Sequence, residues 1–149
     1  MLNITEIRIK LVPGQRDKLR GFASVTVESA LVIRDIKIIE GNDRLFVAMP
    51  SRKLCDRCER CGAKNYVRAR YCNDCGGRLA SDRVGLDERG RPRLYSDIAH
   101  PIHQPARDQI QSAILAAYAE EVEYSMQEGY VAKEFADMDY DSWGEYVAL

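Results

Sequence analysis

The sequence predicts an α+β protein, in which a small antiparallel sheet with a C-terminal helix is interrupted by an inserted module built around four cysteines. Three observations lead to this prediction. Short apolar runs with alternating polar residues fill the first 50 residues, as in half-buried strands. All five cysteines lie between residues 55 and 75. An apolar stripe with the period of an α-helix follows Pro105.

The strands are predicted from the alternation of residue types. Residues 4–12 place three apolar side chains on one face and basic side chains on the other, and a Pro-Gly pair ends the run. Turn signals separate the runs that follow, so the short connections indicate an antiparallel meander. The remaining strands are expected at residues 22–28, 31–39 and 45–49.

The helix is predicted to begin near Pro105, because proline suits the first turn of a helix. We expect it to end near residue 127, before Gly129. Its apolar stripe would lie against one face of the sheet. The residues of this stripe are Ile110, Ala113, Ile114, Ala117 and Tyr118.

The cysteines predict a metal site. Two pairs have the form C-x-x-C-G, in which two intervening residues let both thiolates reach one ion and the glycine permits a tight turn. Four thiolates in a tetrahedral array suit zinc and leave no open coordination position. The predicted cofactor is therefore one structural Zn²⁺ per chain in a zinc ribbon. The predicted ligands are Cys58, Cys61, Cys72 and Cys75.

Two alternatives stay open for this site. Cys55 could replace Cys58 as a ligand, but no C-x-x-C-G pattern would then survive on that side, so we expect Cys55 not to bind the ion. Iron is the alternative to zinc, because ligand softness and geometry alone do not distinguish the two metals.

Charge is unevenly distributed along the chain. Residues 120–149 carry nine acids and one base, whereas residues 1–119 carry 21 bases and 14 acids, a net charge of +7. Residues 52–93 alone hold twelve bases and six acids. A basic surface attracts polyanions, nucleic acid first. We expect the acidic, aromatic tail to fold back on this surface, to pad the sheet or to dock another protein.

Arginines and tyrosines surround the cysteine pairs, and both residue types can serve either nucleic-acid binding or the structure of the ribbon itself. The arginines contact phosphates or form a solvated face. Tyr71 stacks on a base or, as we expect, forms the small core of the ribbon. The candidate nucleic-acid contacts are Arg52, Lys53, Arg68 and Arg70.

Two stretches of the chain resemble known families. Residues 58–79 resemble the short zinc-ribbon module common in bacterial proteins, which often serves interaction or regulation. The stretches ITEIRI, ASVTVESALVIRDIKIIEGNDRLFVAMPSRK and SDIAHPI resemble the bacterial SpoVG family (stage V sporulation protein G, the septation regulators). This second resemblance covers residues 4–53 and 96–118. It implies a small dimeric α+β domain and a DNA-binding and RNA-binding regulator named for effects on septation and sporulation.

The chain departs from that family where the ribbon sits. In the family, a short hairpin joins the Ser-Arg-Lys stretch, which ends here at Lys53, to the aspartate that is here Asp97. In this chain the zinc ribbon is inserted into that connection. The insertion should leave the sheet intact, because a loop insertion costs little when its two ends are already close. The helix carries fewer basic residues than is usual in the family, which weakens the case for helix-borne DNA contacts. The predicted domains are a discontinuous SpoVG-like domain at 1–53 and 94–127, the ribbon and linker at 54–93, and the acidic aromatic tail at 128–149.

The predicted function is a non-enzymatic, homodimeric regulator that binds DNA, RNA or both in the bacterial cytoplasm. The alternative is an adaptor that docks a protein partner through the ribbon or the tail. No nucleophile pattern or carboxylate pair accompanies His100 and His103, so these residues indicate a structural turn. A cytoplasmic location is expected because the sequence shows no membrane-spanning run and no secretory leader.

Overall fold

The computed structural model of the chain describes residues 1–12 and 18–132. The predicted Pro13-Gly14 strand end and residues 133–149 of the predicted tail lie outside the described residues. Within the described residues, no helix has the length and apolar character needed to cross a membrane.

The chain divides into two compact units. The sheet–helix unit comprises Met1–Pro50 together with the chain from His100 onward, and the ribbon unit is Ser51–Ala99. The sequence predicts an inserted domain of residues 54–93, whereas the ribbon unit also includes residues 51–53 and 94–99. These two flanking segments belong to it because residues 51–53 pair with residues 95–97.

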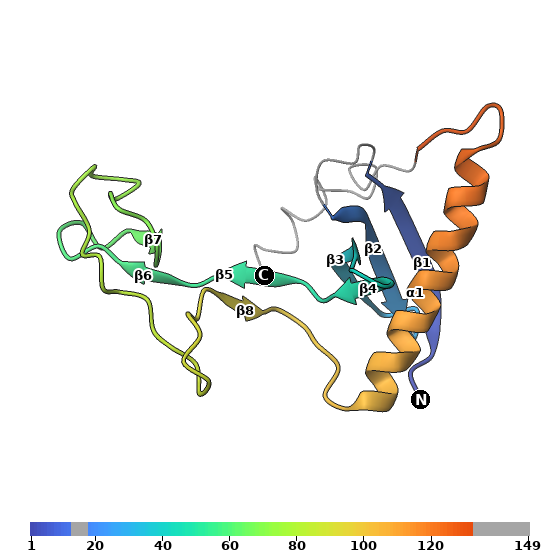
Figure 1. The fold of residues 1–149 in the computed structure, drawn as a ribbon, viewed down its shortest axis with the longest axis horizontal. Coiled ribbons are helices and arrows are strands. Elements are labelled where there is room, and N and C mark those ends of the chain that lie inside the picture. Colours follow the sequence, from blue (N-terminus) through green and yellow to red (C-terminus); the bar gives the residue numbers. More distant parts are fainter. Residues whose placement is uncertain (13–17, 133–149) are drawn as a thin grey trace. The chain divides into compact units, whose positions relative to one another are not determined.

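A four-stranded antiparallel sheet forms one layer of the sheet–helix unit (Figure 1). In their order across the sheet, the strands are β1 (Ile4–Leu11), β2 (Leu19–Val27), β3 (Leu31–Glu40) and β4 (Leu45–Ala48). Between β2 and β3, Glu28 and Ser29 take φ angles of 55° and 52°, and the Ala30 N–H donates to the Val27 carbonyl at 3.0 Å to close the hairpin. The predicted antiparallel sheet is confirmed.

A bulge in β3 decides which of its side chains reach the core. The register with β2 shifts between Ala23 and Val25, where β3 accommodates one extra residue. Asp35 lies in the bulge and takes a φ of 58°, in the left-handed region. Because side chains alternate along a strand, this shift sets the face to which Ile36 and Ile38 point, and both are fully buried.

The helix α1 (Gln104–Ser125) covers one face of the sheet and packs against β1 and β4 (Figure 1). The predicted apolar stripe provides this contact, since Ile110 and Ile114 are buried and Ala117 and Tyr118 pack against the core. The core cluster consists of Ile9, Ala23, Val25, Ile36, Ile38, Val47, Ile110 and Ile114.

Side-chain hydrogen bonds fix both ends of α1. The His103 Nδ1 accepts a hydrogen bond from the Ala106 N–H at 3.1 Å, which satisfies one of the free donors of the first turn. Near the other end, Glu121 is 7% exposed, and the Tyr130 hydroxyl donates to its Oε1 at 2.8 Å. Desolvation and the Glu121 carboxylate raise the pKa of the Tyr130 hydroxyl. The structural role expected for His103 is therefore that of a helix N-cap.

The ribbon unit is built on two short antiparallel strand pairs. β5 (Ser51–Lys53) pairs with β8 (Tyr95–Asp97), so the two ends of the unit form a stem. β6 (Cys55–Arg57) pairs with β7 (Lys64–Tyr66), and the first pair of predicted metal ligands lies in the turn between them.

Candidate metal centre and basic surface

The first cysteine pair lies on a tight knuckle between β6 and β7. The Cys58 N–H donates to the Ala63 carbonyl at 2.8 Å, and the Gly62 N–H donates to the Cys58 carbonyl at 2.9 Å. Gly62 takes a φ of 79°, where a side chain would be strained. The glycine of the C-x-x-C-G pattern is therefore what allows the chain to reverse directly after the second cysteine.

The second knuckle repeats this geometry. The Cys72 N–H donates to the Gly77 carbonyl at 2.7 Å, the Gly76 N–H donates to the Cys72 carbonyl at 3.1 Å, and Gly76 takes a φ of 72°. In each knuckle the first cysteine is buried and the second is exposed. One sequence pattern thus produces two equivalent corners.

The four cysteine sulfurs of the two knuckles lie within 4.8 Å of one another. Between the knuckles, the Sγ atoms of Cys58 and Cys75 are 3.8 Å apart, and those of Cys61 and Cys72 are 3.5 Å apart. A tetrahedral ion with metal–sulfur bonds of about 2.3 Å, the zinc value, holds its sulfurs about 3.8 Å apart. Both the donor set and its spacing therefore fit a four-coordinate metal ion.

Backbone amides point at the sulfurs of this cluster. Because N–H···S hydrogen bonds stabilise the thiolate, they favour the form of cysteine that binds metal. Three of these bonds, each 3.4 Å long, run from Arg60 N–H to Cys58 Sγ, from Asp74 N–H to Cys72 Sγ and from Gly77 N–H to Cys75 Sγ.

The surroundings of the cluster shift the pKa values of Cys61 and Cys72 in opposite directions. The Cys75 N–H, the Asn65 amide and the Asp74 N–H lower the pKa of Cys72 to about 6. For Cys61, the Ala63 N–H lowers the pKa, but the neighbouring thiols and desolvation outweigh it and raise the pKa to about 11. A metal cation supplies the positive charge that such a cluster needs for all its thiols to ionise.

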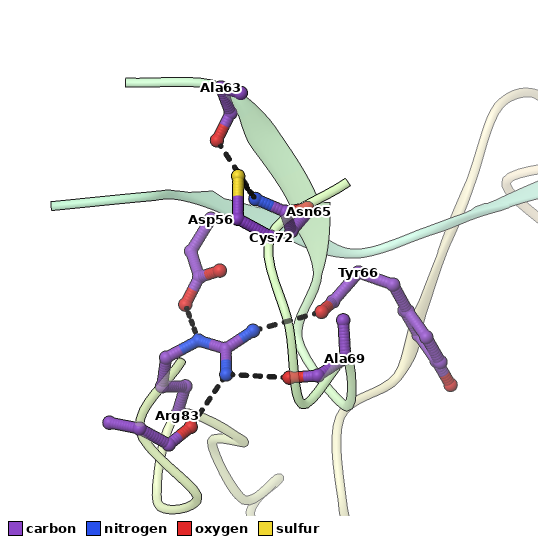
Figure 2. A network of polar contacts seen from close by, with 8 residues as sticks. Asp56, Ala63, Asn65, Tyr66, Ala69, Cys72 and Arg83 are labelled. Atoms are coloured by element: carbon purple, nitrogen blue, oxygen red, sulfur yellow. Dashed lines mark hydrogen bonds and ion pairs between the residues drawn. The ribbon is translucent and has the colours of Figure 1, made fainter. Parts of the chain in front are cut away.

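Asn65 connects the two knuckles through its side-chain amide. It lies on β7 and is 4% exposed. Its Nδ2 donates to the Cys72 Sγ at 3.4 Å and to the Ala63 carbonyl at 3.2 Å (Figure 2). Its Oδ1 accepts a hydrogen bond from the Asn73 N–H at 2.7 Å. This one side chain therefore orients a sulfur and fixes the backbone of both corners.

Arg83 connects the linker after the second knuckle to the rest of the ribbon unit (Figure 2). Its side chain is 14% exposed. The guanidinium donates four hydrogen bonds, to Asp56 Oδ2 at 2.7 Å and to the carbonyls of Tyr66 at 2.9 Å, Ala69 at 3.0 Å and Ala80 at 2.6 Å. The role of Arg83 could not be predicted from the sequence, because nothing in a segment rich in arginine distinguishes the one that bonds the protein backbone from those that face solvent.

Cys55 lies outside the sulfur cluster, as expected. It is exposed on β6, and its Sγ donates to the Lys53 carbonyl at 3.5 Å. The register of β6 with β7 pairs Cys55 with Tyr66, at the end of the strand pair remote from the knuckle turn.

The four candidate nucleic-acid contacts are exposed residues of the ribbon unit. Arg52 and Lys53 lie on β5, where the Lys53 Nζ is 4.8 Å from the centroid of the Tyr66 ring. Arg68 and Arg70 lie between β7 and the second knuckle. Among the described residues, no acidic side chain forms an ion pair with any of the four.

The expectation that Tyr71 forms the core of the ribbon is wrong. Tyr71 is 61% exposed, and the buried side chains of the described ribbon are Cys58, Asn65, Val67 and Cys72. The backbone of Tyr71 forms a bridge with Arg78 across the second knuckle, so the position is fixed by backbone pairing, and the ring is left at the surface.

Comparison with known proteins decides the family. The SpoVG family model matches residues 2–120, from the segment before β1 into α1. The chain belongs to the SpoVG family. The resemblance predicted from the LFVAMPSRK and DIAHPI stretches is thus confirmed, and the two-layer arrangement of sheet and helix agrees with it.

Several SpoVG relatives match most of the chain. A Finegoldia magna protein is 38% identical over 122 residues, which is 82% of this chain and 79% of that protein. A Clostridium beijerinckii protein is 34% identical over 128 residues, covering 86% of this chain and 100% of that protein. An Acholeplasma laidlawii protein is 33% identical over 119 residues, covering 80% of this chain and 87% of that protein. Each carries the name "Putative septation protein SpoVG".

Proposed function

We propose that this SpoVG-family chain is a non-enzymatic, homodimeric regulator that binds nucleic acid through its ribbon unit, which holds one structural zinc ion. The observation that carries the proposal is the distribution of charge. Residues 51–99 hold twelve bases and seven acids, whereas residues 1–50 and 100–119 together hold nine bases and seven acids. The larger basic excess, +5 against +2, therefore belongs to the ribbon unit, and phosphate contacts are expected there. The names of the relatives suggest control of septation as the process served.

Zinc is the metal that the donor set supports best. The four sulfurs have the spacing of a tetrahedral site and accept hydrogen bonds from backbone N–H groups. Four protein ligands leave no position for water or substrate, so the ion would stabilise the fold rather than catalyse a reaction. Elemental analysis of the purified protein should give one zinc per chain. A coloured protein with stoichiometric iron would instead indicate a rubredoxin-like centre.

The nucleic-acid contacts are assigned to Arg52 and Lys53 on β5, with Arg68 and Arg70 as a second group. Lys and Arg that neutralise phosphates release counterions, so binding must weaken with salt. Fluorescence anisotropy with labelled duplex DNA and single-stranded RNA over a salt series measures this directly. Binding that is absent or insensitive to salt contradicts the proposal and favours the adaptor, which docks a protein partner.

Charge reversal locates the contact. The double variant Arg52→Glu/Lys53→Glu should weaken binding to all sequences and reduce the slope of log affinity against log salt by about 2. The control is Lys37→Glu/Arg44→Glu, which makes the same change of charge at exposed residues of the sheet–helix unit. Equal loss in both double variants would mean that only net charge matters and that Arg52 and Lys53 form no contact.

Dimerisation rests on the sheet and on the family. β1 and β4 lie at the two edges of the sheet, and unpaired strand edges favour association. Light scattering at micromolar concentration should give about twice the chain mass of 16.9 kDa. A monomer mass would overturn the homodimer without affecting the test of nucleic-acid binding.

A further inference from the structure

The ribbon unit contains a groove with a volume of about 1030 Å³. It lies between residues 67–71 and residues 78–84, the two stretches that enter and leave the second knuckle. Two backbone contacts join the stretches beside the knuckle, the bridge of Tyr71 with Arg78 and the hydrogen bond from the Leu79 N–H to the Arg70 carbonyl at 2.8 Å. This volume slightly exceeds the range of about 300–1,000 Å³ for small-molecule sites, so the groove has room for part of a polymer.

Arg83 forms a fixed part of this groove. It lines the groove, and its guanidinium donates to Asp56 and to the carbonyl of Ala69. Its donors are directed at the protein, so Arg83 shapes the groove and is not available to bind a ligand.

The other arginines of the groove are available. Arg68, Arg70 and Arg78 line it and are exposed, and no ion pair involves them within the described part of the chain. Asp82 is the acidic residue among the lining residues. Three guanidinium groups against one carboxylate make the groove cationic, and the planar fork of a guanidinium matches the oxygens of a phosphate.

Tyr71 provides a second kind of contact in the same groove. Tyr71 lines the groove and is 61% exposed, and Arg70 and Arg78 line the groove beside it. An exposed aromatic ring among arginines is the arrangement on which unpaired bases stack, whereas the bases of a duplex are stacked on one another and present only their edges.

We propose that this groove binds single-stranded nucleic acid, with Tyr71 stacking on a base and Arg68, Arg70 and Arg78 binding the adjacent phosphates. The proposal rests on the proposed function and adds to it the class of ligand and the place where it binds. Both stretches flank the second knuckle, so we expect binding in the groove to weaken when the metal is removed. Base stacking and phosphate contacts are common to RNA and DNA, so both are expected to bind.

The test measures the affinity of the zinc-loaded full chain for a labelled oligo(U), an oligo(dT) of the same length and a duplex of the same length. Tyr71→Leu should weaken both single strands about tenfold at unchanged salt slope, because it removes stacking and no charge, and should leave duplex affinity unchanged. Arg68→Ala/Arg70→Ala should reduce the salt slope for single strands by about 1.4. Tyr71→Phe keeps an aromatic ring and should bind like the wild type.

The matched control is Tyr124→Leu, which removes an aromatic side chain that is 63% exposed on α1 and does not line the groove. Zinc stoichiometry shows that each variant keeps a folded ribbon. Wild-type affinity of Tyr71→Leu for both single strands, or an equal loss in Tyr124→Leu, overturns the groove while the wild type still binds nucleic acid. If the wild type binds no nucleic acid at all, the proposed function fails and the groove proposal fails with it.

Discussion

In the sheet–helix unit, the core consists of eight apolar side chains, four of them from β2 and β3. In the described ribbon unit, the buried side chains are two cysteines, one valine and one asparagine. The first unit removes enough apolar surface from water to fold by burial, whereas a unit with so small a core depends on other interactions.

The ribbon unit is held together by metal ligands and polar side chains in place of a large apolar core. In the ribbon unit, four sulfurs converge on one point, Asn65 bonds both knuckles, and Arg83 bonds three carbonyls and a carboxylate. These interactions are directional, so the ribbon unit should be sensitive to the loss of single polar groups. The sheet–helix unit should be sensitive to the loss of volume.

The largest effect should follow from Cys72→Ser. Structural zinc contributes about 10 kcal/mol or more to folding, so loss of one ligand should release the metal and unfold the ribbon unit. The core of the sheet–helix unit should persist, because none of its eight residues lies in the ribbon unit. Metal analysis and ¹H–¹⁵N spectra measure the two outcomes separately.

Cys55→Ser is the control for this experiment, since Cys55 is exposed and lies outside the cluster. It should keep full metal content. If Cys72→Ser retained stoichiometric metal, Cys72 would not be a ligand.

The converse substitution is Ile114→Ala, which tests the other unit. Ile114 is fully buried in the core, so truncation should cost about 3 kcal/mol and lower the thermal midpoint of the sheet–helix unit. Metal content should not change. Loss of metal in this variant would show that the two units fold as one cooperative structure, contrary to the comparison.

Arg83→Ala should destabilise the ribbon unit by about 2 kcal/mol, because it removes charge-assisted hydrogen bonds to three carbonyls and leaves Asp56 without its partner. Competition with a zinc chelator measures the loss as faster metal release. Arg89→Ala, at an exposed arginine of the same linker, is the matched control and should behave like the wild type. Arg83→Lys keeps the positive charge but lacks the planar guanidinium that donates to several acceptors at once. It should therefore be more stable than Arg83→Ala and less stable than the wild type.

The smallest effect should come from His103→Ala. Loss of the N-cap hydrogen bond should lower the free energy of unfolding of the sheet–helix unit by about 1 kcal/mol, measured by denaturant titration. His103→Asn keeps an acceptor at this position and should recover most of the difference. Equal stability of the alanine and wild-type proteins would show that α1 needs no cap.

The sequence predicts the parts of this molecule that depend on local patterns. Apolar alternation gave the four strands of the sheet, the stripe containing Ile110 and Ile114 gave the buried face of the helix, and the C-x-x-C-G spacing gave the four cysteines that converge. In each case, the residues within a few positions of one another already determine which face or corner they occupy.

The remaining features depend on contacts between distant residues. The bulge at Asp35 places a residue other than glycine at positive φ. Aspartate adopts this conformation more readily than most residues, but its sequence position alone does not show that β3 bulges there, because the bulge is defined by the register with β2. The ion pair of Arg83 with Asp56 joins residues 27 positions apart. The exposure of Tyr71 could not be predicted because a tyrosine beside a cysteine is compatible with either a core or a surface position.

The pairing of β5 with β8 has a consequence for folding kinetics. α1 must reach β1 and β4 across the whole of Ser51–Ala99, which an unfolded chain has to close as one long loop. Once the ribbon unit has folded and its stem has formed, the effective loop is only a few residues long. Each halving of loop length saves about 0.6 kcal/mol of closure entropy. The sheet–helix unit should therefore refold several-fold faster when metal is bound to the ribbon than when metal is absent.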